Sequence, residues 1–434
     1  MLRDFSLMSR PNGLALARFV RVVIPVLLLA VVSHTSFADT WQGKEVVKDG
    51  VLHVMNPAQP VEDPITIAPD ELWRIGGDEE EDYFFGVLSQ IACNEKGNIY
   101  LLDAQLNKVM IFSPNGEYIR SIGREGEGPG EFRRPSDLFL TTGGDVAVMQ
   151  RMPGKIVLLS PDGEPLGNYP VPELEEGGFQ MLSSGRLAGD HVVLAVQQVL
   201  RREASLDMKM SLIGVSNNGE KTATYLTQKS TRNIANLVMD EKQSGIGVVW
   251  DAGSSGRVYI SDNFDAYRIE MRQPDGTLDR IIEREYESRV RTKEEMERYS
   301  PRAILRRGGR TQRPEVKASK TDRDIQQIFA REDGSLWVLS SKGAFDTEDD
   351  VAAVFDVFDK EGKFTNQVAV KGQGDSRKDG FHIVKDRLYV VTGLRSARQA
   401  MFGGELGDTE DEEADEEPMS LICYDLRPLI QSKK

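Results

Sequence analysis

The sequence predicts an all-β protein: a six-bladed β-propeller, closed by an N-terminal strand in its last blade and carrying a short helical insertion. Three observations predict this fold. A unit of about 47 residues repeats along the chain, apolar residues alternate or run in short stretches between turn formers, and the two ends of the repeat region supply complementary parts of one unit.

The first two units define the repeat. Residues 75–121 align without a gap on residues 122–168, at an offset of 47, and Ser-Pro-Asn-Gly-Glu (113–117) falls on Ser-Pro-Asp-Gly-Glu (160–164). Glycine suits such hairpin turns because it adopts positive φ without steric cost. The element of a turn followed by a strand recurs six times, at residues 97–100, 144–147, 190–193, 256–259, 334–337 and 386–389. We therefore expect six units of four strands.

The ends of the chain predict how the ring closes. The sixth unit stops one strand short, after residues 418–425, while Leu72–Gly77 resembles the fourth-strand segment 118–123. We expect this segment to complete the last blade, because closure leaves no unpaired sheet edge. The propeller then spans residues 71–426, between an N-terminal strand or strap (39–70) and a C-terminal tail (427–434).

Residues 1–38 have the pattern of a signal peptide. Arg10, Arg18 and Arg21 precede the apolar run 22–32, and small residues follow up to Ala38. Eleven apolar residues are too few to span a bilayer, which needs about 20, although a short uncleaved anchor is the alternative. Removal of this segment, with its net charge of +3, changes the formal charge from −15 to −18. We expect an exported monomer, periplasmic or extracellular, whose acidic surface excludes nucleic acid as a partner.

A glycine-rich stretch, "REGEGPGEFRRP" (124–135), could be taken for a phosphate-binding loop. It has no lysine, it carries three glutamates that would repel a phosphate, and no helix pattern follows it. The stretch falls between the fourth strand of one unit and the first strand of the next. We interpret it as a connector between blades, in which glycine permits the tight path.

These motifs resemble NHL-type repeats and the exported six-bladed propellers of bacteria that share a G-x-GEGPGEF connector, over residues 70–425. Related propellers include metal-dependent lyases and lactonases. Asp103 and Asp262 hold the position after the second strand where such repeats often carry Asp, and Gln150 stands there in the second unit. Their oxygens are candidate ligands for Ca²⁺. No other cofactor is predicted.

Histidine and cysteine are scarce after residue 38. His53, His191 and His382 each lie in or beside an aliphatic run without a second histidine at ligand spacing, so we expect packed residues rather than zinc ligands. Cys93 and Cys423 lie in apolar strand-like runs. Buried free thiols are the favoured interpretation, and a disulfide is the alternative.

Two long charged insertions interrupt the repeats. Residues 284–323 contain 13 Lys and Arg against 7 Asp and Glu. Thr292 with Glu295 predicts one capped helix, and Ser300-Pro301 predicts a second that ends at Gly308. The acidic loop 404–418 should project from the same face. It could be a solvated loop, dock on the basic helices or collect Ca²⁺.

We expect a non-catalytic binding protein for a protein, peptide or glycan. The alternative is a metal-dependent (Ca or Zn) lyase or lactonase acting at the central channel. The basic insertion is either a cap over one mouth of the ring or the recognition element. The candidate binding residues are the arginines of the insertion and of a nearby connector: Arg302, Arg306, Arg307, Arg124, Arg133 and Arg134.

Overall fold

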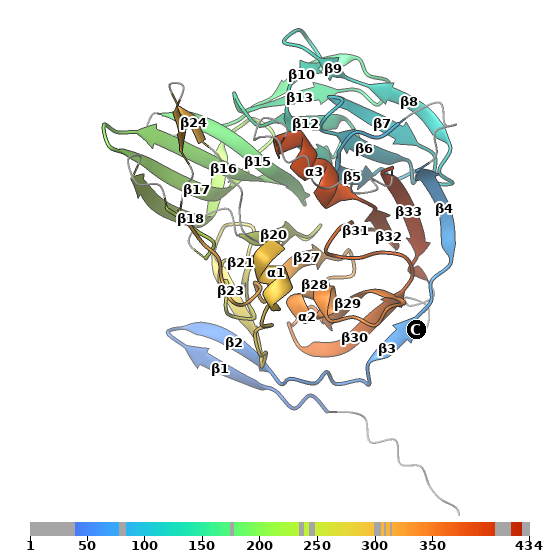
Figure 1. Ribbon diagram of the computed structural model, residues 1–434, viewed down its shortest axis with the longest axis vertical. Helices are drawn as coiled ribbons and strands as arrows, with labels where there is room; N and C mark the ends of the chain where they lie inside the picture. Colours follow the sequence, from blue (N-terminus) through green and yellow to red (C-terminus); the bar gives the residue numbers. More distant parts are fainter. Residues whose placement is uncertain are drawn as a thin grey trace, which may run out of the picture. The chain divides into compact units, whose positions relative to one another are not determined.

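The computed structural model describes residues 40–77, 84–173, 178–233, 238–242, 248–298, 305–307, 310–312, 315–403 and 418–427. Within the unit Asp39–Lys434, six antiparallel sheets carry the repeat and surround a common axis (Figure 1). The predicted fold, a six-bladed β-propeller, is confirmed. The expected signal peptide and most of the C-terminal tail lie outside the described residues.

The first three blades are consecutive four-stranded sheets. Blade one contains β5 (Leu88–Cys93), β6 (Ile99–Asp103), β7 (Lys108–Phe112) and β8 (Tyr118–Ile122). Blade two contains β11 (Pro135–Leu140), β12 (Val146–Gln150), β13 (Lys155–Leu159) and β14 (Pro165–Tyr169). Blade three has longer strands: β15 (Phe179–Ala188), β16 (His191–Arg201), β17 (Ser205–Val215) and β18 (Lys221–Asn233).

The N-terminal segment adds strands to the outer edges of the other three blades. Blade four contains β20 (Val249–Ala252), β21 (Val258–Ser261), β22 (Arg268–Arg272) and β23 (Leu278–Arg284), extended by β2 (Val51–Asn56) and β1 (Lys44–Lys48). Blade five contains β27 (Ile325–Ala330), β28 (Leu336–Ser340), β29 (Val351–Phe358) and β30 (Phe364–Lys371), extended by β3 (Ile65–Ile67). Blade six contains β31 (Gly380–Val384), β32 (Arg387–Val391), β33 (Ser420–Asp425) and β4 (Glu71–Gly76).

The last blade therefore combines both ends of the repeat region. Strand β4 pairs antiparallel with β33, and Trp73 lies opposite Cys423. The pairing places Leu72–Gly77 where the sequence predicts the missing strand. Among the described residues, six buried apolar clusters each join two adjacent blades, including one between blades six and one. The core thus lies between blades, which explains why the middle strand β6 is buried along its whole length.

The glycine-rich stretch is a connector, as predicted. It runs from β8 to β11 and contains two short paired strands, β9 (Arg124–Glu125) and β10 (Glu131–Phe132). Gly123 has φ of +74°, and a Cβ there would lie 2.5 Å from the Phe132 ring. A side chain at residue 123 would therefore be strained by both its backbone and its neighbour.

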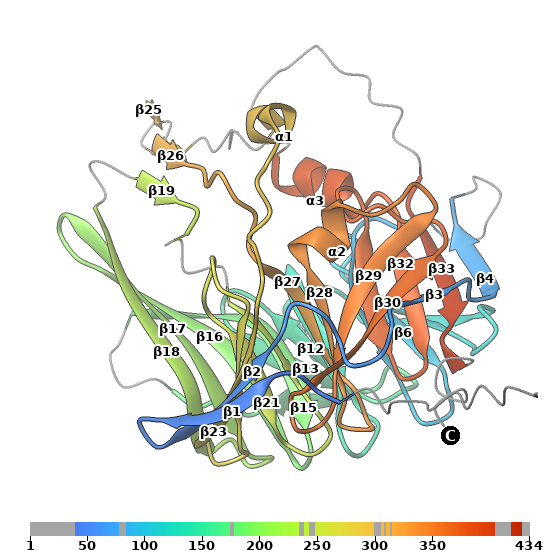
Figure 2. The ribbon, with the colours of Figure 1, turned by 90° about the horizontal axis from the view of Figure 1, so that it is seen from below.

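The helices lie together at the end of the blades where one blade connects to the next (Figure 2). They are α1 (Lys293–Arg298), α2 (Ser341–Phe345) and α3 (Leu394–Gly403). Thr292 Oγ1 accepts a hydrogen bond from the Glu295 amide, and Glu295 Oε2 accepts one from the Thr292 amide, which is the predicted capping box of α1.

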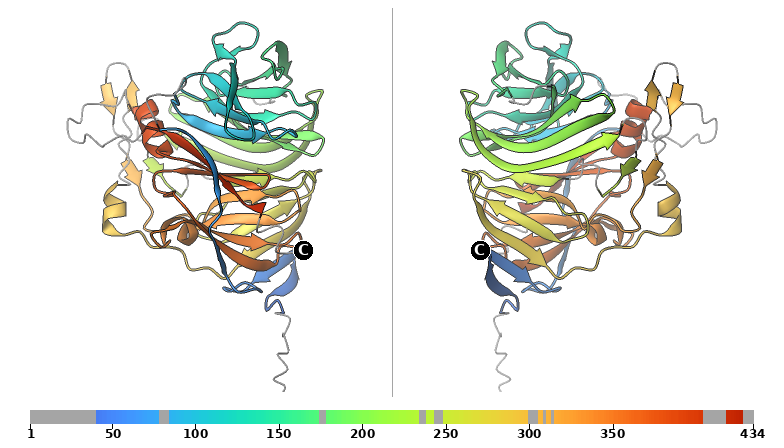
Figure 3. Two further views of the ribbon diagram at one scale, coloured as in Figure 1. Left: turned by 90° about the vertical axis from the view of Figure 1, so that its right-hand side faces the viewer. Right: turned by 90° about the vertical axis from the view of Figure 1, so that its left-hand side faces the viewer.

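The predicted second helix of the insertion is wrong over its described part. Residues Leu305–Arg307 form β24, which pairs antiparallel with β25 (Arg310–Gln312). Arg307 lies opposite Arg310, so the two residues between them are Gly308 and Gly309, a sequence typical of a tight hairpin turn. The strand β26 (Glu315–Lys317) pairs in parallel with β19 (Val238–Asp240), and this layer projects from one side of the blades (Figure 3).

Candidate functional site

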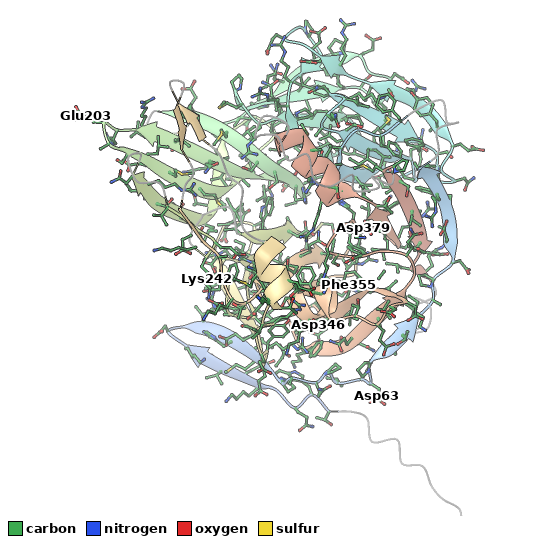
Figure 4. The ribbon with its side chains drawn as sticks, viewed as in Figure 1. Asp63, Glu203, Lys242, Asp346, Phe355 and Asp379 are labelled. Atoms are coloured by element: carbon green, nitrogen blue, oxygen red, sulfur yellow. The ribbon has the colours of Figure 1, made fainter. Side chains whose placement is uncertain are left out.

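Two regions are candidates for function: the insertion and the cavity inside the ring. In the insertion, two buried arginines bind carboxylates. Arg289 pairs with Glu295 of α1, Asp322 and Asp346, at 2.8, 2.6 and 2.6 Å. Arg291 pairs with Glu241 at 2.7 Å and with Asp322 at 2.7 Å. Lys242, next to Glu241, and Asp346 flank α1 in Figure 4.

This network gives the insertion a defined position, because it ties α1 to the segment after β19 and to the end of α2. The network also neutralises part of the positive charge of the insertion. Two of the arginines that make the insertion basic in sequence are neutralised by acids, including Glu241 and Asp346 from outside residues 284–323. Buried pairs of this kind fix geometry more reliably than they add stability.

The six arginines predicted to bind a partner are not brought together in the described part of the structure. Arg302 lies outside the described residues, and Arg306 and Arg307 belong to β24, for which the backbone alone is described. In the connector, Arg124 Nε binds Glu131 Oε1 at 2.7 Å, and Arg133 lies 3.5 Å from Glu127. The Arg134 amide donates to Asn107. Binding by these residues stays a prediction.

The three predicted metal ligands each have partners in the protein. Asp103 accepts four hydrogen bonds from backbone amides, those of Gly86, Val87, Gln105 and Leu106, at 2.7–3.2 Å. Gln150 accepts from the Arg133 amide and donates to the Pro153 carbonyl. Asp262 accepts from the Asn263 side chain. The position after the second strand therefore anchors loops in blades one and two.

No cluster of three or more His, Cys, Asp and Glu side chains suited to a metal ion occurs among the described residues. Both cysteines are free thiols. His191 is buried and bonded to Tyr225, and His53 bonds Glu283, as expected for packed residues. His382 differs, because it lines the cavity inside the ring.

The cavity has a volume of about 1440 Å³ and follows the first strands of all six blades. Its wall continues into the turns that join first and second strands, including Asn94–Lys96 and Thr141–Gly144. These turns lie at the opposite end of the first strands from the blade connectors and the insertion. The cavity thus opens away from the basic insertion.

A repeated β-bulge makes the channel wall polar. Four first strands carry a one-residue shift at the same place, and in each strand the bulged residue and the next one both line the cavity. A bulge re-aims side chains that strict alternation would point into the blade. The pairs are Ser89-Gln90, Ser136-Asp137, Ser183-Ser184 and Gln326-Gln327.

The strongest electrostatic feature of the wall is an arginine between two aspartates. Arg186 Nη1 lies 2.8 Å from Asp137 Oδ2, and Arg186 Nε lies 3.2 Å from Asp251 Oδ1. The guanidinium also lies over the Trp250 ring, with its central carbon 5.8 Å from the centroid. Although burial opposes its charge, Asp137 and Asp251 raise the pKa of Arg186, so it stays protonated.

These channel residues were not predicted from the sequence, although the sequence contains a signal for them. Each bulge appears as two adjacent polar residues inside an otherwise apolar first strand, as in "LSQIA" (88–92) and "PSDLF" (135–139), again at an offset of 47. In a two-residue period one of the two polar residues should face the blade interior. Two adjacent polar residues in an apolar strand therefore indicate a bulge that turns both side chains towards the channel.

The fold and this cavity define the class of the protein: a six-bladed propeller with a polar axial channel. In sequence, residues 79–242 match a family described as a 6-bladed beta-propeller. No curated protein matches the sequence. No helix in the described part of the chain has the length and apolar character needed to cross a membrane.

Solved structures of low sequence identity resemble the chain. A protein from Bacteroides fragilis NCTC 9343, described as exported, is 11% identical over 86% of this chain and 99% of its own, with a TM-score of 0.46. Regucalcin of Agrobacterium tumefaciens, a calcium-binding protein, is 10% identical over 83% and 95%, with a TM-score of 0.39. A gluconolactonase of Xanthomonas campestris is 10% identical over 79% and 87%, with a TM-score of 0.39. At such identities the similarity concerns the fold alone.

Proposed function

We propose that the protein is an exported, non-catalytic binding module and that its ligand, a peptide or a glycan, occupies the central channel. The supporting observation is the cavity of about 1440 Å³ with its repeated polar wall. Pockets for drug-sized molecules measure about 300–1,000 Å³, so this cavity has room for several sugar or amino-acid units. Export is supported by the signal-like residues 1–38.

The chemistry of the wall favours binding over catalysis. Asp137 is 3% exposed, and its carboxylate accepts hydrogen bonds from Gln90, Arg186 and the amides of Leu138 and Gly185. A carboxylate whose oxygens are already occupied is poorly placed to take a proton from a substrate. Asp137 therefore serves to position Arg186 on the wall.

The insertion supports a second candidate function, the docking of a partner protein on the opposite face. The ion pairs of Arg289 and Arg291, together with the pairing of β19 with β26, hold the two described ends of the insertion on the propeller. A recognition element held in this way loses little conformational entropy on binding. Arg302, Arg306 and Arg307 are the residues we expect to make the contacts.

The channel proposal is tested by filling the channel. Ser183 is exposed to the cavity and its hydroxyl makes no hydrogen bond to a described residue, so Ser183→Trp should fill space without removing a side-chain hydrogen bond. Ser121→Trp, on the outermost strand of blade one, is the control outside the channel lining, and it removes only an exposed hydrogen bond with Tyr118. Each variant is purified from the cell envelope, and bound small molecules are released and identified by mass spectrometry.

We expect the ligand to accompany the wild type and Ser121→Trp, and to fall at least tenfold in Ser183→Trp at an unchanged melting temperature. If Ser183→Trp carries as much of the same ligand as the wild type, the ligand does not occupy the channel and the proposal is wrong.

A further inference from the structure

In the channel wall, the acceptor oxygens of the aspartates already hold hydrogen bonds, whereas some donor groups of the basic side chains hold none to a described residue. On the acidic side, the oxygens of Asp137 accept four hydrogen bonds, and those of Asp251 accept from Arg186 Nε at 3.2 Å and from the Ala330 amide at 2.9 Å. Both carboxylates are therefore occupied by groups of the wall itself. A ligand that offers donors to these oxygens would have to displace hydrogen bonds already made.

On the basic side, donors remain available. Arg186 uses Nε and Nη1 on the two aspartates and the Gly185 carbonyl, whereas its Nη2 makes no hydrogen bond to any residue that the structure describes. About a third of the Arg186 side chain is exposed, at 33%. Its guanidinium is thus fixed on one edge by the wall and open on the other.

A second arginine, on α3, contacts a residue of the channel wall. Leu394, Ala397 and Met401 of this helix pack on the apolar cluster between blades six and one. From the same helix, Arg398 Nη2 donates to the carbonyl of Ser89, a residue of the channel wall, at 3.4 Å. Arg398 forms no ion pair within 4 Å with any carboxylate in the described part of the chain, although Asp137 favours its charge from a greater distance.

His382 is a third nitrogen-bearing side chain at the channel, and it lines the same cavity as Arg186. It lies on β31 of blade six, and its imidazole makes no hydrogen bond to a described residue. Burial, with the positive charges of Arg398 and Arg186, lowers the pKa of His382 to about 3. Both guanidinium groups therefore act on the same imidazole, which is neutral at physiological pH and keeps one N–H free to donate.

We propose that the channel recognises a carboxylate group of its ligand, which Arg186 and Arg398 bind from two sides with His382 donating beside them. This inference rests on the proposed function and adds the chemical class of the ligand. A guanidinium matches a carboxylate in shape and charge, and each arginine has donors to spare. Asp137 and Asp251 keep Arg186 in place, since its Nε and Nη1 are already bound.

Two kinds of ligand offer this carboxylate: a short peptide with a free C-terminus and an oligosaccharide containing uronic acid. Isothermal titration calorimetry on the mature chain separates them with matched probes that differ only in the acid. One pair is acetyl-trialanine and its C-terminal amide, and the other is trigalacturonate and galactotriose. We expect one acid to bind at least tenfold more tightly than its neutral counterpart, and the pair that does so identifies the source.

The arginine of α3 supplies the test by mutation, because Arg186→Gln would leave two buried aspartates unpaired and could prevent folding. Arg398→Gln should weaken binding of the acid at least tenfold and leave the neutral probe unchanged. Arg395→Gln is the matched control, since Arg395 belongs to the same helix but lies against Phe345, 6.0 Å from its ring centroid. The control should bind the acid as the wild type does.

Equal binding of acid and neutral probes, or no binding of either acid at millimolar concentration, would overturn the carboxylate inference. So would an Arg398→Gln protein that binds the acid with unchanged affinity. None of these results decides whether a ligand occupies the channel, which the Ser183→Trp experiment tests separately.

Discussion

The substitution Asp137→Asn isolates the charge that holds the channel wall. An amide has nearly the same size as the carboxylate, but it replaces one acceptor oxygen by an NH₂ donor. In one orientation this donor faces the Leu138 amide and the Gln90 side chain, which bind at 2.8 and 2.7 Å. In the other it faces the Gly185 amide and Arg186, at 3.0 and 2.8 Å. Either orientation brings donors against donors.

The magnitude follows from these contacts. Removing one partner of a buried ion pair costs about 3–5 kcal/mol, and because Arg186 keeps Asp251 we expect the lower end, about 3 kcal/mol. Urea unfolding followed by tryptophan fluorescence measures the loss as a lower midpoint at an unchanged slope. Ser136→Ala, at the neighbouring bulge residue, removes a neutral hydrogen bond to the Leu182 carbonyl and should cost about 1 kcal/mol or less. A loss below about 1 kcal/mol in Asp137→Asn would refute the reasoning.

Three further predictions concern the loops and the insertion. The hydrogen bond from Arg289 lowers the pKa of Glu295 from 4.5 to about 2. The stability that the ionised Glu295 contributes should therefore be present above pH 4.5 and lost as the pH falls towards 2. Urea unfolding should show this loss, about 1 kcal/mol, in the wild type but not in Glu295→Gln. Asp103→Asn should lower the free energy of unfolding by about 2 kcal/mol, because it disrupts four hydrogen bonds from backbone amides. Neither Asp103→Asn nor Asp262→Asn should change the amount of bound Ca²⁺ in equilibrium dialysis. Loss of one Ca²⁺ per chain in both variants would favour the metal-dependent alternative. Charge reversal at Arg302, Arg306 and Arg307 should reduce capture of a partner protein from the cell envelope at least tenfold. The control Lys44→Glu/Lys48→Glu on β1 should not reduce it. Unchanged capture by the charge-reversed protein, with its fold intact, would contradict the docking hypothesis.

Features encoded by neighbouring residues could be predicted from the sequence. The blade repeat is one of them, because each unit carries its own turns and apolar strands within about 47 residues. The capping box of α1 is another, because Thr292 and Glu295 form it between themselves. The second helix of the insertion, expected from Ser300-Pro301 to Gly308, is wrong over Leu305–Arg307, because these residues pair with Arg310–Gln312 as strands, a partner that the helix-start and helix-end signals do not reveal.

The roles of polar residues were harder to predict. Asp103 and Gln150 are predicted metal ligands, and metal binding by them stays a prediction; in the structure their side chains bind backbone groups of the loops around them. The sequence shows that such residues recur at one position of the repeat, but it does not show which groups they face. Those groups come both from the connector before the first strand and from the residues that follow the second strand.

The sequence by itself determined the number of blades, the four strands in each and the connector between blades, because these depend on turns and alternation within a few tens of residues. The tertiary structure alone decided what the channel contains. Arg186 and His382 come from blades three and six, and Arg398 from a helix outside the repeat. Arg186 and Arg398 act on His382 because the closed ring brings blade three, blade six and α3 to one channel, and no local pattern encodes that convergence.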